Sequence, residues 1–213
     1  MQLHDSWSLW YDQTWDDRVV ICPKIDTVQQ AWAVLSSVPP PSELAPRSTL
    51  SLFRHGTQPS WEHPANLGGG RWAVDIQRRG GALRGREDKL WESLFAAIVG
   101  ETIESAGAAA ATSSSPPVPA SSSLTTNSIC VTGASVSVTH NGRRLRVSLW
   151  TRNAQHQELQ RAIGSKLAEV VSTATSSLAA KSPENRPVER VVLRFRPHSA
   201  GRRSRGLQFP IEL

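Results

Sequence analysis

The stretch Leu52–Trp72 reads LFRHGTQPSWEHPANLGGGRW. Pro59 and Pro64 bracket Trp61 and Glu62, and two prolines this close exclude a helix and disfavour a central strand. Trp61 is therefore expected on a loop, where its ring either caps the core beside a solvated Glu62 or stays open to a ligand. A flat aromatic face beside a carboxylate suits a planar cationic ligand with hydrogen-bond donors along one edge.

Alternating apolar residues predict strands on both sides of this loop and along the rest of the chain. The predicted strands are Ser6–Tyr11, Arg18–Ile25, Leu50–Phe53, Arg71–Arg78 and Val188–Phe195. Ile129–Trp150 also alternates, and Asn141-Gly142 in its middle predicts a β-hairpin.

Three segments predict helices, each with a single apolar face. Thr27–Val38 begins with a T-x-x-Q capping-box pattern, and Asp88–Glu104 and Asn153–Leu178 follow later in the chain. An antiparallel sheet covered on one side by helices, an α+β fold, accounts for this organisation.

The length of 213 residues suits one domain, which we place at 1–213. Ser105–Ser128 consists mainly of Ala, Ser, Thr and Pro and carries no charge. Such a segment buries too little apolar surface to order itself, so we expect a flexible low-complexity insertion within the domain.

The charge balance favours a polyanionic partner. The chain has 24 Lys and Arg against 18 Asp and Glu, and 20 of the cations are Arg, whose planar fork grips phosphate with two hydrogen bonds. The isolated Cys22 and Cys130 predict neither a disulfide scaffold nor a zinc site and favour a reducing compartment. The N-terminus lacks a signal-peptide pattern, so an intracellular, soluble protein is expected.

Tryptophan is over-represented, with eight Trp against four Phe and one Tyr. Trp15 lies in the polar, turn-like segment Asp12–Asp17, which makes it a second loop tryptophan. Either it packs onto the core or, like Trp61, it serves a ligand.

Several motifs together resemble the eukaryotic translation initiation factor 4E family, the messenger-RNA cap-binding proteins. The matching motifs are W-S-L-W-Y, T-V-Q-Q-A-W, S-L-F-R-H-G-T-Q-P-S-W-E, G-G-R-W, L-W-E-S-L-F-A-A-I-V-G-E, S-L-W-T-R and I-G-S-K. They follow in the family's order from Leu3 to His198. The resemblance implies a curved eight-stranded antiparallel sheet with three helices on its convex face.

The resemblance also implies a site for the cap base on the concave face. The two loop tryptophans that sandwich 7-methylguanine in the family match Trp15 and Trp61. The carboxylate that accepts hydrogen bonds from guanine N1 and N2 matches Glu62, and the Trp that lies against the methyl group matches Trp150.

For the cap phosphates, the resemblance implies arginines on the sheet and its loops. Arg71 and Arg146 match basic positions of the family. The hairpin is two residues longer than usual, so a displaced tip can supply further charge, and the basic tail matches a mobile loop of the family. The additional candidates are Arg143, Arg144, Arg202, Arg203 and Arg205.

A partner surface is implied on the convex face, where family scaffolds and repressors dock a short helix on residues that match Val28 and Trp32. The N-terminal arm, here Leu3, contacts partners as well. Glu92 and Ser93 replace an apolar residue and a Glu of the family, so a docking leucine would meet a carboxylate. We expect a scaffold of the 4G type or a 4E-binding repressor, bound with a divergent or shifted footprint.

The implied function is non-catalytic, cofactor-free binding of the 7-methylguanosine cap, which recruits mRNA to translation initiation in the cytoplasm, with a nuclear fraction allowed. A repressor or storage homologue is the alternative role. A decapping hydrolase would need metal-holding carboxylates or a nucleophilic His, whereas Glu87–Asp88 and Asp16–Asp17 are adjacent pairs and the six His are scattered. A general single-strand RNA binder is a further class, insensitive to free cap analogue.

Overall fold

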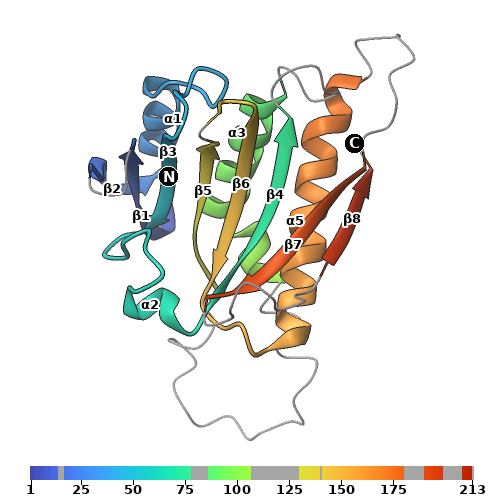
Figure 1. The fold of residues 1–213 in the computed structure, drawn as a ribbon. Helices are drawn as coiled ribbons and strands as arrows, with labels where there is room; N and C mark the ends of the chain where they lie inside the picture. The colour runs from blue at the N-terminus through green and yellow to red at the C-terminus, as the bar shows by residue number, and fades with distance from the viewer. Residues whose placement is uncertain are drawn as a thin grey trace, which may run out of the picture.

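The computed structural model describes residues 1–13, 17–77, 86–106, 130–139, 141–179, 190–198 and 208–212. Its strands form one eight-stranded sheet in the order β2-β1-β3-β5-β6-β4-β7-β8 (Figure 1). All strand pairs are antiparallel. The strands are β1 (Gln2–Asp12), β2 (Val19–Thr27), β3 (Thr49–Arg54), β4 (Gly70–Gln77), β5 (Val131–Val138), β6 (Arg144–Thr151), β7 (Arg190–Pro197) and β8 (Gln208–Glu212).

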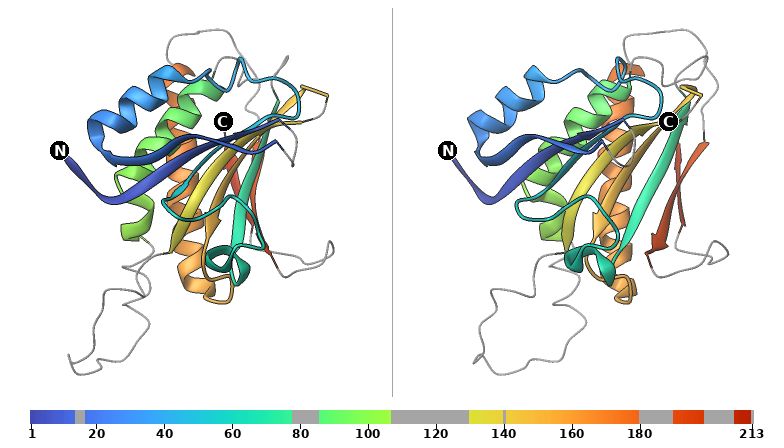
Figure 2. Two further views of the ribbon diagram at one scale, coloured as in Figure 1. Left: turned by 90° about the vertical axis from the view of Figure 1, so that its left-hand side faces the viewer. Right: turned by 60° about the vertical axis from the view of Figure 1, so that its left-hand side comes forward.

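Three long helices cover one face of this sheet, and the sheet curves around them (Figure 2). They are α1 (Val28–Ser37), α3 (Glu87–Val99) and α5 (Gln157–Ala179). A short helix, α2 (Pro64–Leu67), lies in the connection between β3 and β4. The predicted α+β fold, a curved eight-stranded antiparallel sheet with three helices on one side, is confirmed.

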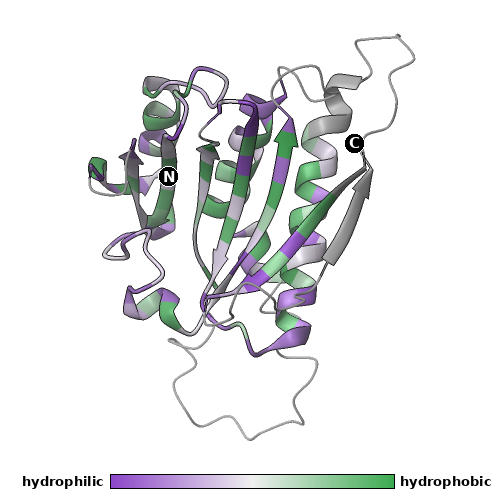
Figure 3. Cartoon of the chain, in the orientation of Figure 1, coloured by the Kyte–Doolittle hydropathy of each residue, from purple (hydrophilic) through white to green (hydrophobic). Residues whose placement is uncertain are grey.

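The period of two along each strand separates a core face from an open face (Figure 3). In β4, Trp72, Val74 and Ile76 are buried and lie on the helix side, whereas Arg71 and Asp75 alternate with them. The adjacent strand β6 repeats this pattern with buried Leu145, Val147 and Leu149. The face opposite the helices, called the open face below, is therefore polar at its centre, and no long helix of the described ranges covers it.

Helix α1 begins as the T-x-x-Q pattern predicts. The Gln30 amide donates to Thr27 Oγ1 at 3.1 Å, and the Gln30 side chain accepts from the Thr27 amide at 3.1 Å. This reciprocal capping box satisfies amides that a helix start otherwise leaves unpaired.

Two segments differ from the sequence-based expectations. β1 begins at Gln2, four residues before the predicted strand, and β8 lies in the tail, where no strand was expected. Of the predicted insertion Ser105–Ser128, the described residues include 105 and 106, which end a helical turn, and the remainder lies outside the described part. None of the helices in the described ranges is long and apolar enough to span a bilayer.

Candidate functional site

Trp61 lies on the loop between β3 and α2, as the flanking prolines predict. Half of its surface is exposed (50%), which is high for so large an apolar side chain. Glu62 is exposed next to it, and one of its oxygens, Oε2, accepts a hydrogen bond from Ser60 Oγ at 2.7 Å. The loop thus presents an indole and a carboxylate side by side, with neither consumed by the core.

Asn66, the third residue of α2, fixes the shape of this loop from the buried side. It is fully buried, and its Nδ2 donates to the carbonyl oxygens of Gln58 at 3.0 Å and Ser60 at 2.8 Å. These bonds hold the backbone on the N-terminal side of Trp61, so they fix the turn that carries the indole. Sequence reasoning missed Asn66.

The glycines after α2 let the loop pass close to the end of the sheet. A Cβ on Gly69 would lie 1.8 Å from the carbonyl oxygen of Thr151, the last residue of β6. The Gly69 carbonyl accepts from the His198 amide at 2.9 Å. The Trp61 loop is therefore joined to the ends of β6 and β7.

Trp150 lies on the open face of β6 and is nearly covered, with 8% of its surface exposed. Phe53 meets its ring edge-on at 5.4 Å, and His198 lies over it at 4.8 Å between ring centroids. Trp150 Nε1 donates to Ser135 Oγ at 3.3 Å. Trp150 thus forms part of the floor of the open face.

His198 was not predicted, and it links three parts of the site. Its Nδ1 donates to the Asn66 carbonyl at 2.7 Å, while its ring lies against Trp150. Burial lowers the pKa of His198 and the positive charge of Arg71 lowers it further, which together outweigh the hydrogen bond to the Asn66 carbonyl that raises it. A neutral imidazole at neutral pH follows from both causes.

Arg71, the predicted phosphate-side residue, lies beside Trp150 on the open face. It pairs with Trp150 of β6 on one side and with Arg196 of β7 on the other. Burial, followed by the charges of Arg146 and Arg196, lowers its pKa. Arg71 remains a cation, and its setting favours any anion that would offset the surrounding charge.

Arg146, the second predicted residue, is held by a carboxylate. Its Nε and Nη2 donate to the two oxygens of Asp75 at 2.7 and 2.8 Å. Burial raises the pKa of Asp75, but the hydrogen bonds and charge of Arg146 outweigh that effect and lower it. Arg146 therefore faces the open side with its guanidinium fork already engaged.

Two further arginines, Arg194 and Arg196, were missed. Both are exposed and alternate in β7 with the buried Leu193 and Phe195, which places them on the open face. This alternation is visible in the sequence and could have identified them. A small cavity of about 70 Å³ is lined by Arg71, Ala73, Asp75, Arg146, Arg194 and Arg196, and the four arginines are called the arginine cluster below.

The remaining predicted ligand residues lie at the hairpin tip or outside the described part. Arg144 begins β6, pairs with Gln77 and is exposed, and Arg143 is exposed at the turn. Trp15 and the three tail arginines, Arg202, Arg203 and Arg205, fall outside the described residues.

The helix face carries a separate pocket. Trp32 of α1 is 44% exposed and, with Leu35, Trp91 and Glu92, lines a pocket of about 370 Å³ whose wall includes Pro39–Pro41. Glu92 pairs with Lys89 at 2.9 Å. The other predicted partner residues are Val28 and Ser93, both partly exposed, and Leu3, which packs against the core.

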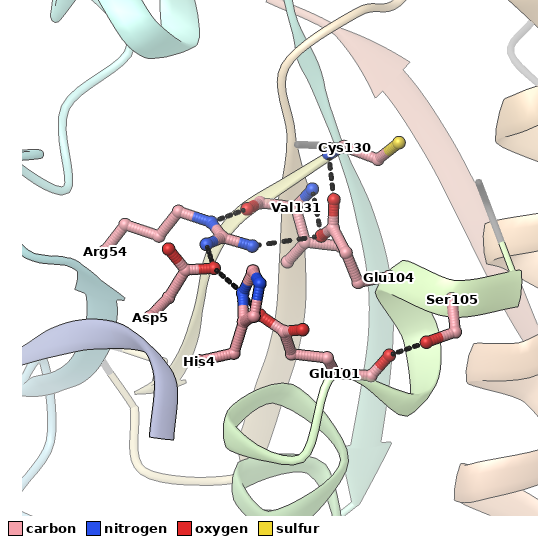
Figure 4. Close-up of polar contacts among 8 residues, drawn as sticks. All are labelled: His4, Asp5, Arg54, Glu101, Glu104, Ser105, Cys130 and Val131. Carbon is pink, nitrogen blue, oxygen red and sulfur yellow. Dashed lines mark hydrogen bonds and ion pairs between the residues drawn. The ribbon is translucent and has the colours of Figure 1, made fainter. Parts of the chain in front are cut away.

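A polar cluster lies away from both surfaces, between β1, β3 and the residues after α3 (Figure 4). Ligand atoms of His4, Asp5 and Glu101 lie within 4.8 Å of one another. The guanidinium of Arg54 pairs with Asp5 and supplies positive charge there, where a metal ion would otherwise be needed to offset the carboxylates. The cluster is therefore an ion-pair network.

Comparisons of this sequence with a family model and with individual proteins point to the same family. The sequence model described as "Eukaryotic initiation factor 4E" matches residues 2–197. Eukaryotic translation initiation factor 4E of Saccharomyces cerevisiae is 27% identical over 176 residues, which cover 79% of this chain and 70% of that relative.

Solved structures agree in fold. Ascaris suum eIF4E-3 in complex with an m7G cap aligns with a TM-score of 0.70 and 23% identity, over 97% of this chain and 96% of that one. C. elegans eIF4E-3 in complex with the 4E-binding protein Mextli aligns with a TM-score of 0.67 and 26% identity, over 92% and 93%.

Proposed function

This chain belongs to the eukaryotic initiation factor 4E family, and we propose that it binds the 7-methylguanosine cap of mRNA on its open face. The family consists of non-catalytic cap-binding proteins, as the sequence predicted. The observation that carries the proposal is the half-exposed Trp61 beside Glu62, braced by Asn66 at the edge of a face that holds the arginine cluster.

The base would stack on Trp61, with Trp15 as the second plate. Methylation at N7 makes guanine a delocalised cation, and an indole face attracts a cation as well as stacking on it. Stacking of one base on an aromatic side chain contributes about 1–3 kcal/mol, and the cation–π attraction adds to it. Unmethylated guanine keeps only the first contribution, so the preference for a methylated cap arises here.

Glu62 would accept hydrogen bonds from N1 and N2 of the base. A carboxylate accepts only, and guanine offers donors at both positions, so the pairing is charge-assisted and stronger than a neutral one. We assign the remaining exposed edge of Trp150 to the N7-methyl group. Arg71, one strand away from Trp150, would take the first phosphates, with Arg146 beyond it.

Trp61→Ala tests the base site, with Trp32→Ala as a matched control because both indoles are about half exposed on opposite faces. Titration calorimetry should show that Trp61→Ala weakens binding of 7-methyl-GTP by about 1–3 kcal/mol, roughly 5- to 150-fold. Trp32→Ala should bind it as the unmodified protein does. Equal affinities of the unmodified protein for 7-methyl-GTP and GTP would refute the proposal.

The same titration distinguishes the competing classes. Free 7-methyl-GTP should displace capped RNA, whereas a general single-strand RNA binder would retain it. Incubation of the protein with capped RNA and Mg²⁺ should release no methylated nucleotide, whereas a decapping hydrolase would release it.

On the helix face we propose that a 4E-binding protein docks, a scaffold of the 4G type or a repressor, so that the bound mRNA reaches or is withheld from initiation in the cytoplasm. Support comes from the exposed Trp32 and its pocket, and from the C. elegans neighbour, which is in complex with Mextli. Glu92 in this pocket favours a divergent partner and keeps the repressor role open. Restoration of capped-reporter translation in an extract depleted of its own cap-binding factor would identify the activating role.

A further inference from the structure

The arginine cluster extends beyond Arg71 and Arg146, the two residues assigned above to the cap phosphates, onto Arg194 and Arg196 of β7. Four guanidinium groups line one small cavity with a single carboxylate, Asp75. Both oxygens of Asp75 are bound by Arg146. Within the described part of the chain, none of Arg71, Arg194 and Arg196 lies within ion-pair distance of a carboxylate, so their charges are left for a ligand.

The sheet arranges these free charges in a line leading away from the base site. Trp150, Arg71 and Arg196 are register partners on three neighbouring strands, which lie about 4.8 Å apart. Arg194 lies two residues before Arg196 on the same strand, and its register partner on β4 is Ala73. The small Ala73 leaves space between the guanidinium groups, and this space is the cavity.

The direction of this line matters for the ligand. Arg196 and Arg194 lie on the side of Arg71 away from Trp150. A phosphate held by these two arginines therefore lies farther from the cap base than a phosphate held by Arg71. Both side chains are exposed, which suits contact with a polyanion at the surface better than a tight, buried ion site. Two arginines on one face of a strand present charges repeating at a spacing comparable with that of successive phosphates in an extended nucleic acid.

We propose that Arg194 and Arg196 bind the phosphodiester backbone of the RNA downstream of the cap. This rests on the proposed cap-binding function and adds the path of the RNA to it: from Trp150 across Arg71 onto β7. Backbone contacts of this kind raise the affinity for any capped transcript without selecting its sequence. They also make that affinity depend on salt, because each phosphate neutralised releases counterions.

The test compares two ligands, 7-methyl-GTP and a capped single-stranded oligonucleotide of about ten nucleotides, by fluorescence anisotropy between 50 and 300 mM KCl. The variant is Arg194→Gln with Arg196→Gln. The matched control is Arg161→Gln with Lys166→Gln, which removes two positive charges from α5 on the opposite face. Thermal melting of each variant confirms that it is folded.

The double variant should lose at least fivefold more affinity for the capped oligonucleotide than for 7-methyl-GTP at the lowest salt. Its slope of log K against log salt for the oligonucleotide should be smaller by about 1.4, because each phosphate of a single strand that an arginine neutralises contributes about 0.7. The control should keep the affinities and slope of the unmodified protein.

Two results would overturn the inference: an unchanged slope for the oligonucleotide, or equal losses for both ligands, since the latter places the arginines on the cap triphosphate itself. An uncapped oligonucleotide of the same length separates this inference from the cap site. If the unmodified protein fails to prefer 7-methyl-GTP over GTP while the double variant still lowers the slope for uncapped RNA, the cap proposal fails and the RNA path stands.

Discussion

Arg54 shows how one buried charge joins several elements of the fold. Its Nε donates to the Val131 carbonyl at 2.7 Å, Nη2 donates to Glu104 at 3.3 Å, and Nη1 pairs with Asp5 (Figure 4). The guanidinium also lies 4.9 Å from the centre of the Trp7 ring. One side chain thus joins β1, β3 and β5 to the helical residues after α3.

Replacing Arg54 with Met should destabilise the protein severely. The change keeps an apolar stem but leaves Asp5 and Glu104 without their cation, and breaking a buried ion pair typically costs about 3–5 kcal/mol. Asp5 is partly exposed, so the lower end of that range applies. Urea unfolding measures the loss, and Arg161→Met on the exposed surface of α5 serves as the control, expected within about 0.5 kcal/mol of the unmodified protein.

The pH dependence of that loss identifies its cause. Burial raises the pKa of Asp5, but hydrogen bonds with Glu101 and Arg54 and the charge of Arg54 outweigh it and hold the pKa at about 2, below its ordinary 3.8. A depressed pKa contributes stability that is complete above about pH 4 and is lost as the pH falls toward 2. The difference between Arg54→Met and the unmodified protein should therefore shrink over this window, and a constant difference would assign the loss to packing alone.

Which residues could be predicted depends on the kind of signal they leave in the sequence. Trp61 and Glu62 stand out because prolines and glycines around them leave an aromatic and a carboxylate on a loop. Asn66 and His198 leave no such signal, because each is a single polar residue whose partners are backbone carbonyls brought close only by the fold. Trp15 stays a prediction.

At the scale of elements, the connection from α2 to β4 determines how closely the Trp61 loop approaches the sheet. Gly69 admits no side chain, because a Cβ would lie 1.8 Å from a backbone carbonyl oxygen of β6. Gly68, its neighbour, has 3.8 Å to the nearest such atom. The path of this loop therefore requires glycine at position 69, whereas position 68 has room for a Cβ.

Gly69→Ala should lower stability and cap affinity together. Relieving the contact requires a backbone shift, and overpacking of this kind costs about 1–3 kcal/mol. The shift moves the loop that carries Trp61, so 7-methyl-GTP binding should weaken as well. Gly68→Ala should leave both quantities nearly unchanged, and equal effects of the two substitutions in urea unfolding and calorimetry would contradict this account.

Elements with regular periodicity were predicted, and those without it were not. The three helices and most strands follow from apolar positions spaced at 3.6 or 2 residues. β8 was not predicted, because its five residues include Pro210 and follow an arginine-rich tail. It forms as an edge strand paired only with β7, where proline is tolerated.

For the whole molecule, the tryptophans in the described ranges divide between the core and the surfaces on either side of it. Trp7, Trp72 and Trp91 are fully buried between sheet and helices. Trp61 stands at the edge of the open face, and Trp32 is exposed on the helix side. The tryptophan excess in the composition thus reflects two surfaces, separated by the core, where indoles remain available to ligands.

This separation predicts that the surfaces can be changed independently, with Glu92 as the test. In the pocket beside Trp32, its carboxylate would lose hydration against the leucine of a docking helix, so Glu92→Leu should strengthen binding of a leucine-containing 4E-binding peptide by at least fivefold. Calorimetry with that peptide measures the gain, and Glu169→Leu on α5 makes the same chemical change away from the pocket.

The affinity of Glu92→Leu for 7-methyl-GTP should stay within twofold of the unmodified protein, because the sheet and its core lie between this pocket and the open face. Trp61→Ala should conversely leave peptide binding intact. Unchanged peptide affinity in both Glu92→Leu and Trp32→Ala would show that the partner's footprint avoids this pocket. A large loss in Trp32→Ala alone would place the docking leucine on Trp32 but out of reach of the Glu92 carboxylate.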